Sequence, residues 1–199
     1  VQIKELQKRD LFPLTYKNTN FPLLVKLYGY LLGDGYIQIC NKKGLIAAYG
    51  VEEDLIEMQE DFKKLGFSAR IYSRTRDHSI PTRYGKSEFT TENFELHVSS
   101  SSLVNLFFKL GYPKGNKTAT AFELPDWIMH SPRWIKRLFL AGFFGAELSS
   151  PTTHTKTGFT CPVLSQNKNN SVLQSGRNFM IQIMTLLEES GVRVDKIIH

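Results

Sequence analysis

An apolar run from Phe21 to about Gly33 predicts a helix, with a proline at its second residue, where helices tolerate one. Residues 36–40 then alternate between apolar and polar positions, which is typical of a strand. Asp34 falls between these two elements. A carboxylate there lies at the negative end of the helix dipole, which is unfavourable unless a positive charge lies beside it.

Downstream of this helix, the pattern predicts a mixture of antiparallel strands and helices. A turn over residues 41–44 joins the first strand to a second one in a hairpin. The further predicted strands cover about residues 45–51, 67–74 and 89–98, and the further predicted helices cover about residues 53–65 and 103–110. Hairpins interspersed with helices in this order indicate the α+β fold class.

A second helix of the same kind begins after Ser131 and ends at Glu147. Its segment LAGFFGAE aligns with LYGYLLGD of the first helix, so that Glu147 matches Asp34. Each helix carries small residues four positions apart, which form a smooth stripe on one face. These small residues are Gly29, Gly33, Gly142 and Ala146. Two such stripes predict that the helices pack against each other more closely than the usual spacing of roughly 8–10 Å.

Helices packed in this way bring Asp34 and Glu147 together at adjacent negative helix ends. Two like charges beside two dipole ends destabilise the site, and a divalent cation relieves the repulsion. Carboxylates and water are the ligands that Mg²⁺ prefers, so Mg²⁺ (or Mn²⁺) is the expected cofactor. Either acid alone could be a solvated loop residue, but the matched pair favours a shared metal site.

The two helices resemble the paired LAGLIDADG (dodecapeptide) motifs of homing endonucleases, in the single-chain form that is often found inside inteins. The resemblance covers about residues 21–199. It implies a pseudo-twofold repeat of αββαββα units, whose saddle-shaped antiparallel sheets lie in the DNA major groove. It also implies that Asp34 and Glu147 are the metal-binding, catalytic residues, one for each strand of a long, asymmetric double-stranded DNA site.

The connector between the two halves carries a further part of the resemblance. Its sequence GNK, followed by LPDWI, is similar to the block that holds an active-site lysine in intein-type members, and the match falls on Lys117. The second motif departs from the family pattern at two positions. Glu147 stands where aspartate is usual, and Leu148 stands where glycine is usual.

The repeat divides the chain into a lead-in over residues 1–20, a first half over residues 21–130 and a second half over residues 131–199. The second half is predicted to be incomplete, because only eight residues follow Gly191, whereas its counterpart Gly66 precedes about 45 residues of the first half. Either the chain is a cut fragment, or its second half is degenerate, or the missing elements come from elsewhere. The resemblance implies the endonuclease part of an intein, which acts as a monomeric pseudo-dimer.

The composition agrees with an intracellular nucleic-acid-binding protein. The net charge of +6 is typical of a protein with a polyanionic partner, of which nucleic acid is the commonest, and equally of a basic protein without one. Two cysteines, Cys40 and Cys161, are too few for a disulfide scaffold or a zinc site. The sequence has no apolar run of about 18 residues, so no contact with a membrane is expected.

Basic and polar side chains mark a candidate DNA-binding surface. Arg70, Tyr72, Arg74 and Arg76 recur at a spacing of two and so share one strand face. Arginine is the usual reader of guanine in the major groove. The other candidates lie in the following loop and in the two hairpin regions: Arg83, Lys86, Gln38, Lys42, Lys43, His154, Lys156 and Lys168. Each of them could equally belong to a solvated face.

Two alternatives to a nuclease remain. The family fold also serves in non-catalytic nucleic-acid binders, such as RNA maturases and DNA-binding regulators that have lost the acids, and the presence of both Asp34 and Glu147 favours the nuclease over these. A phosphate-binding glycine loop at residues 32–35 is disfavoured, because such loops precede a helix and this one follows it.

Overall fold

The computed structural model describes residues 1–83, 85–153, 158–195 and 197. Its first unit has the order αββαββα and confirms the predicted α+β fold class. The elements are α2 (Phe21–Asp34), β1 (Gly35–Cys40), β2 (Lys43–Gly50), α3 (Glu52–Lys64), β3 (Ala69–Thr82), β4 (Gly85–Ser99) and α4 (Ser101–Lys109). A short helix, α1 (Gln2–Gln7), precedes this unit.

The second unit repeats the beginning of the first. It consists of α6 (Arg133–Glu147), β5 (Thr152–Thr153), β6 (Phe159–Thr160), the short 3₁₀ helix η1 (Asn170–Val172) and α7 (Leu173–Glu189), and α5 (Asp126–Met129) stands before it. Residues 192–195, which follow Gly191, have no regular structure. In the described part of the chain, the second unit therefore has the αββα half of the repeat.

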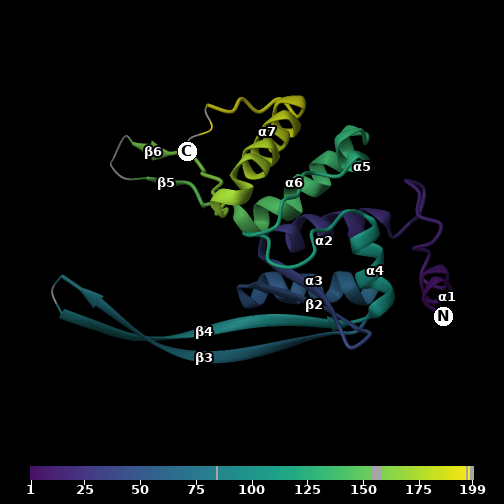
Figure 1. Cartoon of the computed structure of the whole chain (residues 1–199), viewed down its shortest axis with the longest axis horizontal. Coiled ribbons are helices and arrows are strands. Elements are labelled where there is room, and N and C mark those ends of the chain that lie inside the picture. Colours follow the sequence, from purple (N-terminus) through teal and green to yellow (C-terminus); the bar gives the residue numbers. More distant parts are fainter. Residues whose placement is uncertain (84, 154–157, 196, 198–199) are drawn as a thin grey trace.

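The first unit forms one antiparallel sheet in the order β1-β2-β4-β3. Helices cover one side of this sheet, as Figure 1 shows. Strand alternation turns Ile37, Ile46, Leu96 and Val98 toward those helices, and each is almost completely buried. The opposite side of the sheet is left to solvent, as expected for an antiparallel sheet with one face on the core.

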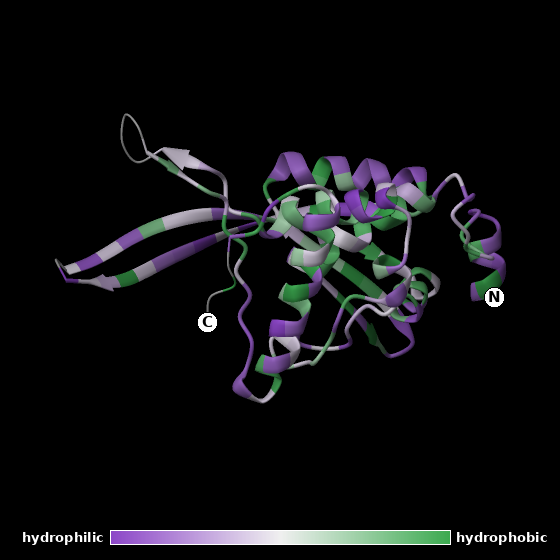
Figure 2. Cartoon of the chain, turned by 90° about the horizontal axis from the view of Figure 1, so that it is seen from above, coloured by the Kyte–Doolittle hydropathy of each residue, from purple (hydrophilic) through white to green (hydrophobic). Residues whose placement is uncertain are grey.

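The β3 and β4 strands run much further than the sequence pattern predicts. Their pairing is continuous from Ala69↔Val98 to Thr82↔Gly85, so the predicted loop between residues 75 and 88 is wrong. This far part is exposed on both faces, and it therefore lacks the alternation that marks a strand with one buried face. Figure 2 shows it as a projecting ribbon in mostly hydrophilic and intermediate colours, on the same side as β5 and β6.

The core between the units is the contact of α2 with α6, where the two backbones touch. A methyl group added to Gly29 would overlap the Phe139 carbonyl oxygen of α6. A methyl group added to Gly142 would overlap the Lys26 carbonyl oxygen of α2. Only glycine allows this approach, so these two positions set the distance between the helices.

The predicted lead-in over residues 1–20 packs onto the first unit. Leu6 and Leu11 are buried in the core. Arg9 donates from Nε to the Gly66 carbonyl oxygen at 2.9 Å, and its guanidinium lies 4.6 Å from the centre of the Phe67 ring. The segment thus ties α1 to the turn between α3 and β3. No helix in the described residues is long and apolar enough to cross a membrane.

The close approach of the helices predicts opposite effects for two alanine substitutions in α6. Gly142→Ala should destabilise the protein by about 1–3 kcal/mol or more, because the new methyl group pushes α2 away. Gly145→Ala should stabilise it by about 0.5–1 kcal/mol, because the nearest atom to its methyl group, Tyr30 Cδ2, is 4.0 Å away and alanine favours helix. Urea unfolding measures both changes, and equal effects of the two variants would contradict the backbone contact.

Candidate functional site

The two predicted acids lie at the touching ends of α2 and α6. Asp34 is the last residue of α2 and Glu147 is the last residue of α6. Directly before Asp34, a methyl group added to Gly33 would lie 2.6 Å from the Ala146 Cβ and 2.7 Å from the Glu147 Cγ. The structure therefore brings together all four predicted small residues and both acids.

Lys117 supplies the positive charge that the end of α2 requires. Its ammonium donates to the carbonyl oxygens of Leu32, at 2.8 Å, and Gly33. The last carbonyl groups of a helix have no partner within the helix, so a buried ammonium satisfies them and offsets the dipole. The Tyr112 hydroxyl also donates to this helix end, to the Leu31 carbonyl oxygen at 2.7 Å.

The pKa values at the site reflect burial and mutual repulsion. Burial raises the pKa of Asp34 above its usual range. Burial also raises the pKa of Glu147, and the negative charge of Asp34 raises it further. The pKa of Lys117 is lowered to about 8, mainly by burial, while the charges of the two acids oppose this change. Lys117 in turn lowers the pKa of both acids, so it helps to keep them ionised.

The donor set fits a hard divalent cation. Two carboxylates with raised pKa values repel each other, and a cation between them would remove that cost. Nowhere in residues 1–83, 85–153 and 158–195 do three or more His, Cys, Asp or Glu side chains gather for a metal. Asp34 and Glu147 would therefore leave several ligand positions to water and substrate oxygens, which is how Mg²⁺ is usually bound.

A pocket of about 500 Å³ opens beside these groups. Lys117 and Glu147 line it, together with residues 32–33 of α2 and residues 165–168 of the second unit. The pocket gives a ligand access to the end of the helix pair.

Lys168 lies behind Lys117 in the structure. Its ammonium donates to the Lys117 carbonyl oxygen at 2.7 Å and lies 3.7 Å from the centre of the Phe122 ring. Burial lowers its pKa. The ammonium is thus engaged in holding the connector that carries Lys117, and the structure does not place it with the other predicted DNA-binding residues.

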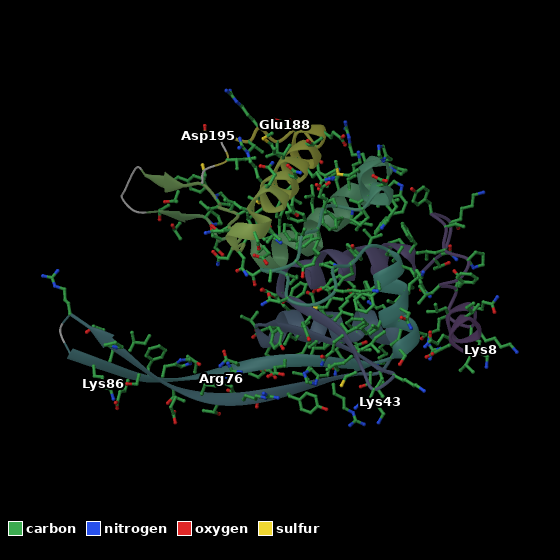
Figure 3. The ribbon with its side chains drawn as sticks, viewed as in Figure 1. Lys8, Lys43, Arg76, Lys86, Glu188 and Asp195 are labelled. Atoms are coloured by element: carbon green, nitrogen blue, oxygen red, sulfur yellow. The ribbon has the colours of Figure 1, made fainter. Side chains whose placement is uncertain are left out.

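The sheet surface opposite the core carries half of the twelve predicted DNA-binding residues. Strand β3 presents Arg70, Tyr72, Arg74 and Arg76 on this surface, which we call the basic face. The register places Gln38 and Lys43 of the first hairpin on the same face. On the far part of the ribbon, His78 stacks on Phe89 with ring centres 5.0 Å apart. In Figure 3, Lys43 and Arg76 follow one another along the sheet toward the ribbon end.

The other face of the projecting ribbon is acidic. Asp77, Glu88 and Glu92 lie on it by strand alternation. Lys86 belongs to this face too and forms an ion pair with Glu88 at 3.5 Å. The ribbon therefore has one side that suits a polyanion and one that does not.

The remaining predicted residues lie at turns or outside the described part. Lys42 is exposed in the turn between β1 and β2, and its carbonyl oxygen accepts from Ser101. Arg83 follows directly on β3, at the tip of the ribbon, and not in a longer loop. His154 and Lys156 lie outside the described residues.

Sequence reasoning missed Tyr112 and Glu95. Tyr112 stands in the connector five residues before Lys117, and no sequence pattern indicates that it reaches the end of α2. Glu95 is a buried acid on the basic face, paired in register with Tyr72. The alternation of the predicted strand over residues 89–98 already places Glu95 opposite the buried Leu96 and Val98, but its burial depends on Arg74 of β3, a contact that no local pattern reveals.

Comparison with protein families and curated proteins gives relatives with different names. No family model matches the chain. The chain is 38% identical over 192 residues to the tRNA-splicing ligase RtcB of Pyrococcus furiosus, which covers 96% of this chain and 20% of that protein. It is 31% identical over 195 residues to the DNA-directed RNA polymerase subunit Rpo1N of Methanocaldococcus jannaschii, which covers 96% of this chain and 14% of that protein. The chain thus spans about a fifth or less of the length of these relatives.

Among solved structures, the chain is similar to the homing endonuclease I-WcaI bound to its DNA recognition sequence. The TM-score is 0.48 at 15% sequence identity, and the match covers 92% of this chain and 78% of the other.

The raised pKa values predict that metal-free protein becomes more stable when Asp34 loses its charge. An acid with a raised pKa in the folded state binds protons more tightly there than in the unfolded chain, so stability falls as the pH rises above about 4. Asp34→Asn removes this loss and should raise the melting temperature at pH 7 by about 1–4 °C in EDTA.

The gain should shrink as the pH is lowered from 7 toward 4. Calorimetry at several pH values measures it, and Asp195→Asn, an exposed position near the C-terminus, is the matched control that should change nothing. A lower melting temperature for Asp34→Asn at every pH would contradict the repulsion between the acids.

Proposed function

We propose that this chain is the endonuclease part of an intein and cuts double-stranded DNA at a long, asymmetric site with Mg²⁺ or Mn²⁺. The observation that carries the proposal is the meeting of Asp34 and Glu147 at the ends of two helices whose backbones touch, with the Lys117 ammonium beside them. Such a group of charges costs stability, and a protein retains it where the charges have a use.

The relatives support the intein part of the proposal. Two proteins with unrelated names, a tRNA-splicing ligase and an RNA polymerase subunit, each match almost the whole of this chain with a fifth or less of their own length. A segment that is shared by hosts with different activities is explained by insertion into each host. An inserted endonuclease accounts for this distribution, because cutting DNA at a chosen site is how such an insert spreads.

Each side chain at the site has a role in phosphodiester hydrolysis. Asp34 and Glu147 would hold the metal, which when bound activates water and stabilises the charge on the leaving oxygen. Lys117 keeps both acids ionised through its positive charge and holds the end of α2 in place. One acid from each unit suits one scissile phosphate on each DNA strand, in a single chain that acts as a pseudo-dimer.

The basic face of the sheet suits the major groove of DNA. A two-stranded antiparallel ribbon fits that groove, and Arg70, Tyr72, Arg74 and Arg76 lie along one side of this ribbon. The acidic opposite side would point away from the phosphates. This arrangement favours one orientation of the ribbon on the duplex.

The basic face predicts a steep dependence of DNA affinity on salt. Arg70→Ala combined with Arg76→Ala should lower the slope of log affinity against log salt by about 0.9 for each phosphate contact that is lost. Lys63→Ala is the control, because this exposed lysine lies on α3, on the other side of the sheet. Fluorescence anisotropy over a salt series measures the slopes. Equal slopes for all variants would show that the DNA-binding surface lies elsewhere on the protein.

Cleavage separates the endonuclease from a non-catalytic binder of the same fold. Asp34→Asn and Glu147→Gln should each lower cleavage by more than about 100-fold, since even the residues that support metal ligands are worth roughly 10–100-fold. DNA binding should persist or improve, because a negative charge near phosphates is removed.

The matched controls are Asp195→Asn and Glu188→Gln, because Figure 3 shows both residues far from the sheet. Both control variants should cut the duplex at the rate of the wild type. The substrate is a duplex selected from a random library for binding to the chain. If the wild-type chain binds this duplex but does not cut it in Mg²⁺ or Mn²⁺, the protein is a non-catalytic DNA-binding regulator or RNA maturase and not a nuclease.

A further inference from the structure

A buried carboxylate lies in the middle of the basic face. Glu95 is only 6% exposed, although the register pairs it with Tyr72, whose side chain points to solvent. A surface that binds DNA gains nothing from a bare carboxylate, because phosphates repel it. A buried acid in this position therefore requires partners on the same face.

Glu95 has one partner for each of its oxygens. Its Oε1 forms an ion pair with the Arg74 Nε at 3.1 Å. Its Oε2 lies 3.0 Å from the His97 Nε2. The Tyr72 ring then packs on His97 with ring centres 5.0 Å apart. Three side chains of the basic face are thus ordered around one carboxylate.

The contact with Glu95 leaves the end of the Arg74 guanidinium available. Arginine has five N–H donors, and the ion pair with Glu95 is formed through Nε, which leaves the four N–H groups of the two terminal nitrogens. The side chain of Arg74 remains 58% exposed. Its two terminal nitrogens match the O6 and N7 acceptors of guanine, which arginine contacts in a bidentate manner.

The pairing with Glu95 suits a base better than a phosphate. Attraction to phosphate depends on net positive charge, which the carboxylate offsets. A bidentate contact to a base depends on the orientation of the guanidinium, which the ion pair with the carboxylate restricts. Arg70 and Arg76 on the same strand form no ion pair with any side chain in the described part of the chain, so the fixed arginine differs from its neighbours.

We propose that Arg74 reads one guanine of the DNA target and that Glu95 is the positioning residue that orients it. This inference rests on the proposed DNA-binding function and adds a specificity determinant to it. It predicts that a change at Glu95, which itself touches no base, alters the preference for a base at one position of the site.

The test measures base preference at each position, by selection of bound duplexes from a random library in EDTA. Arg74→Lys should lower the preference for guanine at one position by roughly 10-fold or more, while the salt slope stays the same because the charge is kept. Glu95→Gln should lower the preference at that same position, while overall affinity stays level or rises. In the Arg74→Lys background, Glu95→Gln should cause no further loss there.

Glu92→Gln is the matched control, because this exposed glutamate lies on the same strand and faces the other way. It removes the same charge and should leave every base preference unchanged. Thermal melts confirm that each variant is folded.

Three results would overturn the inference. In the first, Glu95→Gln keeps all preferences of the wild type. In the second, Glu92→Gln and Glu95→Gln act alike. In the third, Arg74→Lys changes the salt slope and no preference. All three leave DNA binding intact, whereas a wild-type chain that binds no duplex overturns the proposed function itself.

Discussion

The direct backbone contact between α2 and α6 is the constraint on which the rest of the structure depends. Because Gly29 and Gly142 each face a carbonyl oxygen of the other helix, neither helix can move away without losing the fit. The contact fixes where both helices end, and so it places Asp34 beside Glu147. It also fixes where the hairpins that follow these ends begin. Figure 1 shows the second of them, β5–β6, projecting on the same side of the molecule as the β3–β4 ribbon.

The unfavourable position of Asp34 at the negative end of α2 is offset by the Lys117 ammonium, which comes from far along the chain. Lys117 reaches the last carbonyls of α2, and its own pKa falls to about 8 because it is buried there. The site therefore holds three charged groups, and burial disfavours the charged form of each of them. Two acids against one lysine leave a negative excess, which a bound cation would offset.

The sequence predicts those parts of the structure that are repeated or half-buried. The two helices, their small residues and their final acids follow from the aligned segments, and the inner sheet follows from its alternation. The far ribbon could not be predicted, because residues 75–82 and 85–88 have no buried face and so no apolar pattern. The inward course of Lys168 and the packing of Arg9 on Phe67 depend on partners distant in sequence, which no local pattern reveals.

The connector that carries Lys117 is fastened to the second unit as well as to the first. Thr118 accepts a hydrogen bond from Asn169, and the Leu124 amide donates to Gln182 of α7. The lysine that completes the end of α2 is thus held in place by the opposite half of the molecule. Neither unit is an autonomous module: an exchange of one half for that of a relative would inherit the acids but lose the support of the lysine, so the halves are constrained to evolve as a pair.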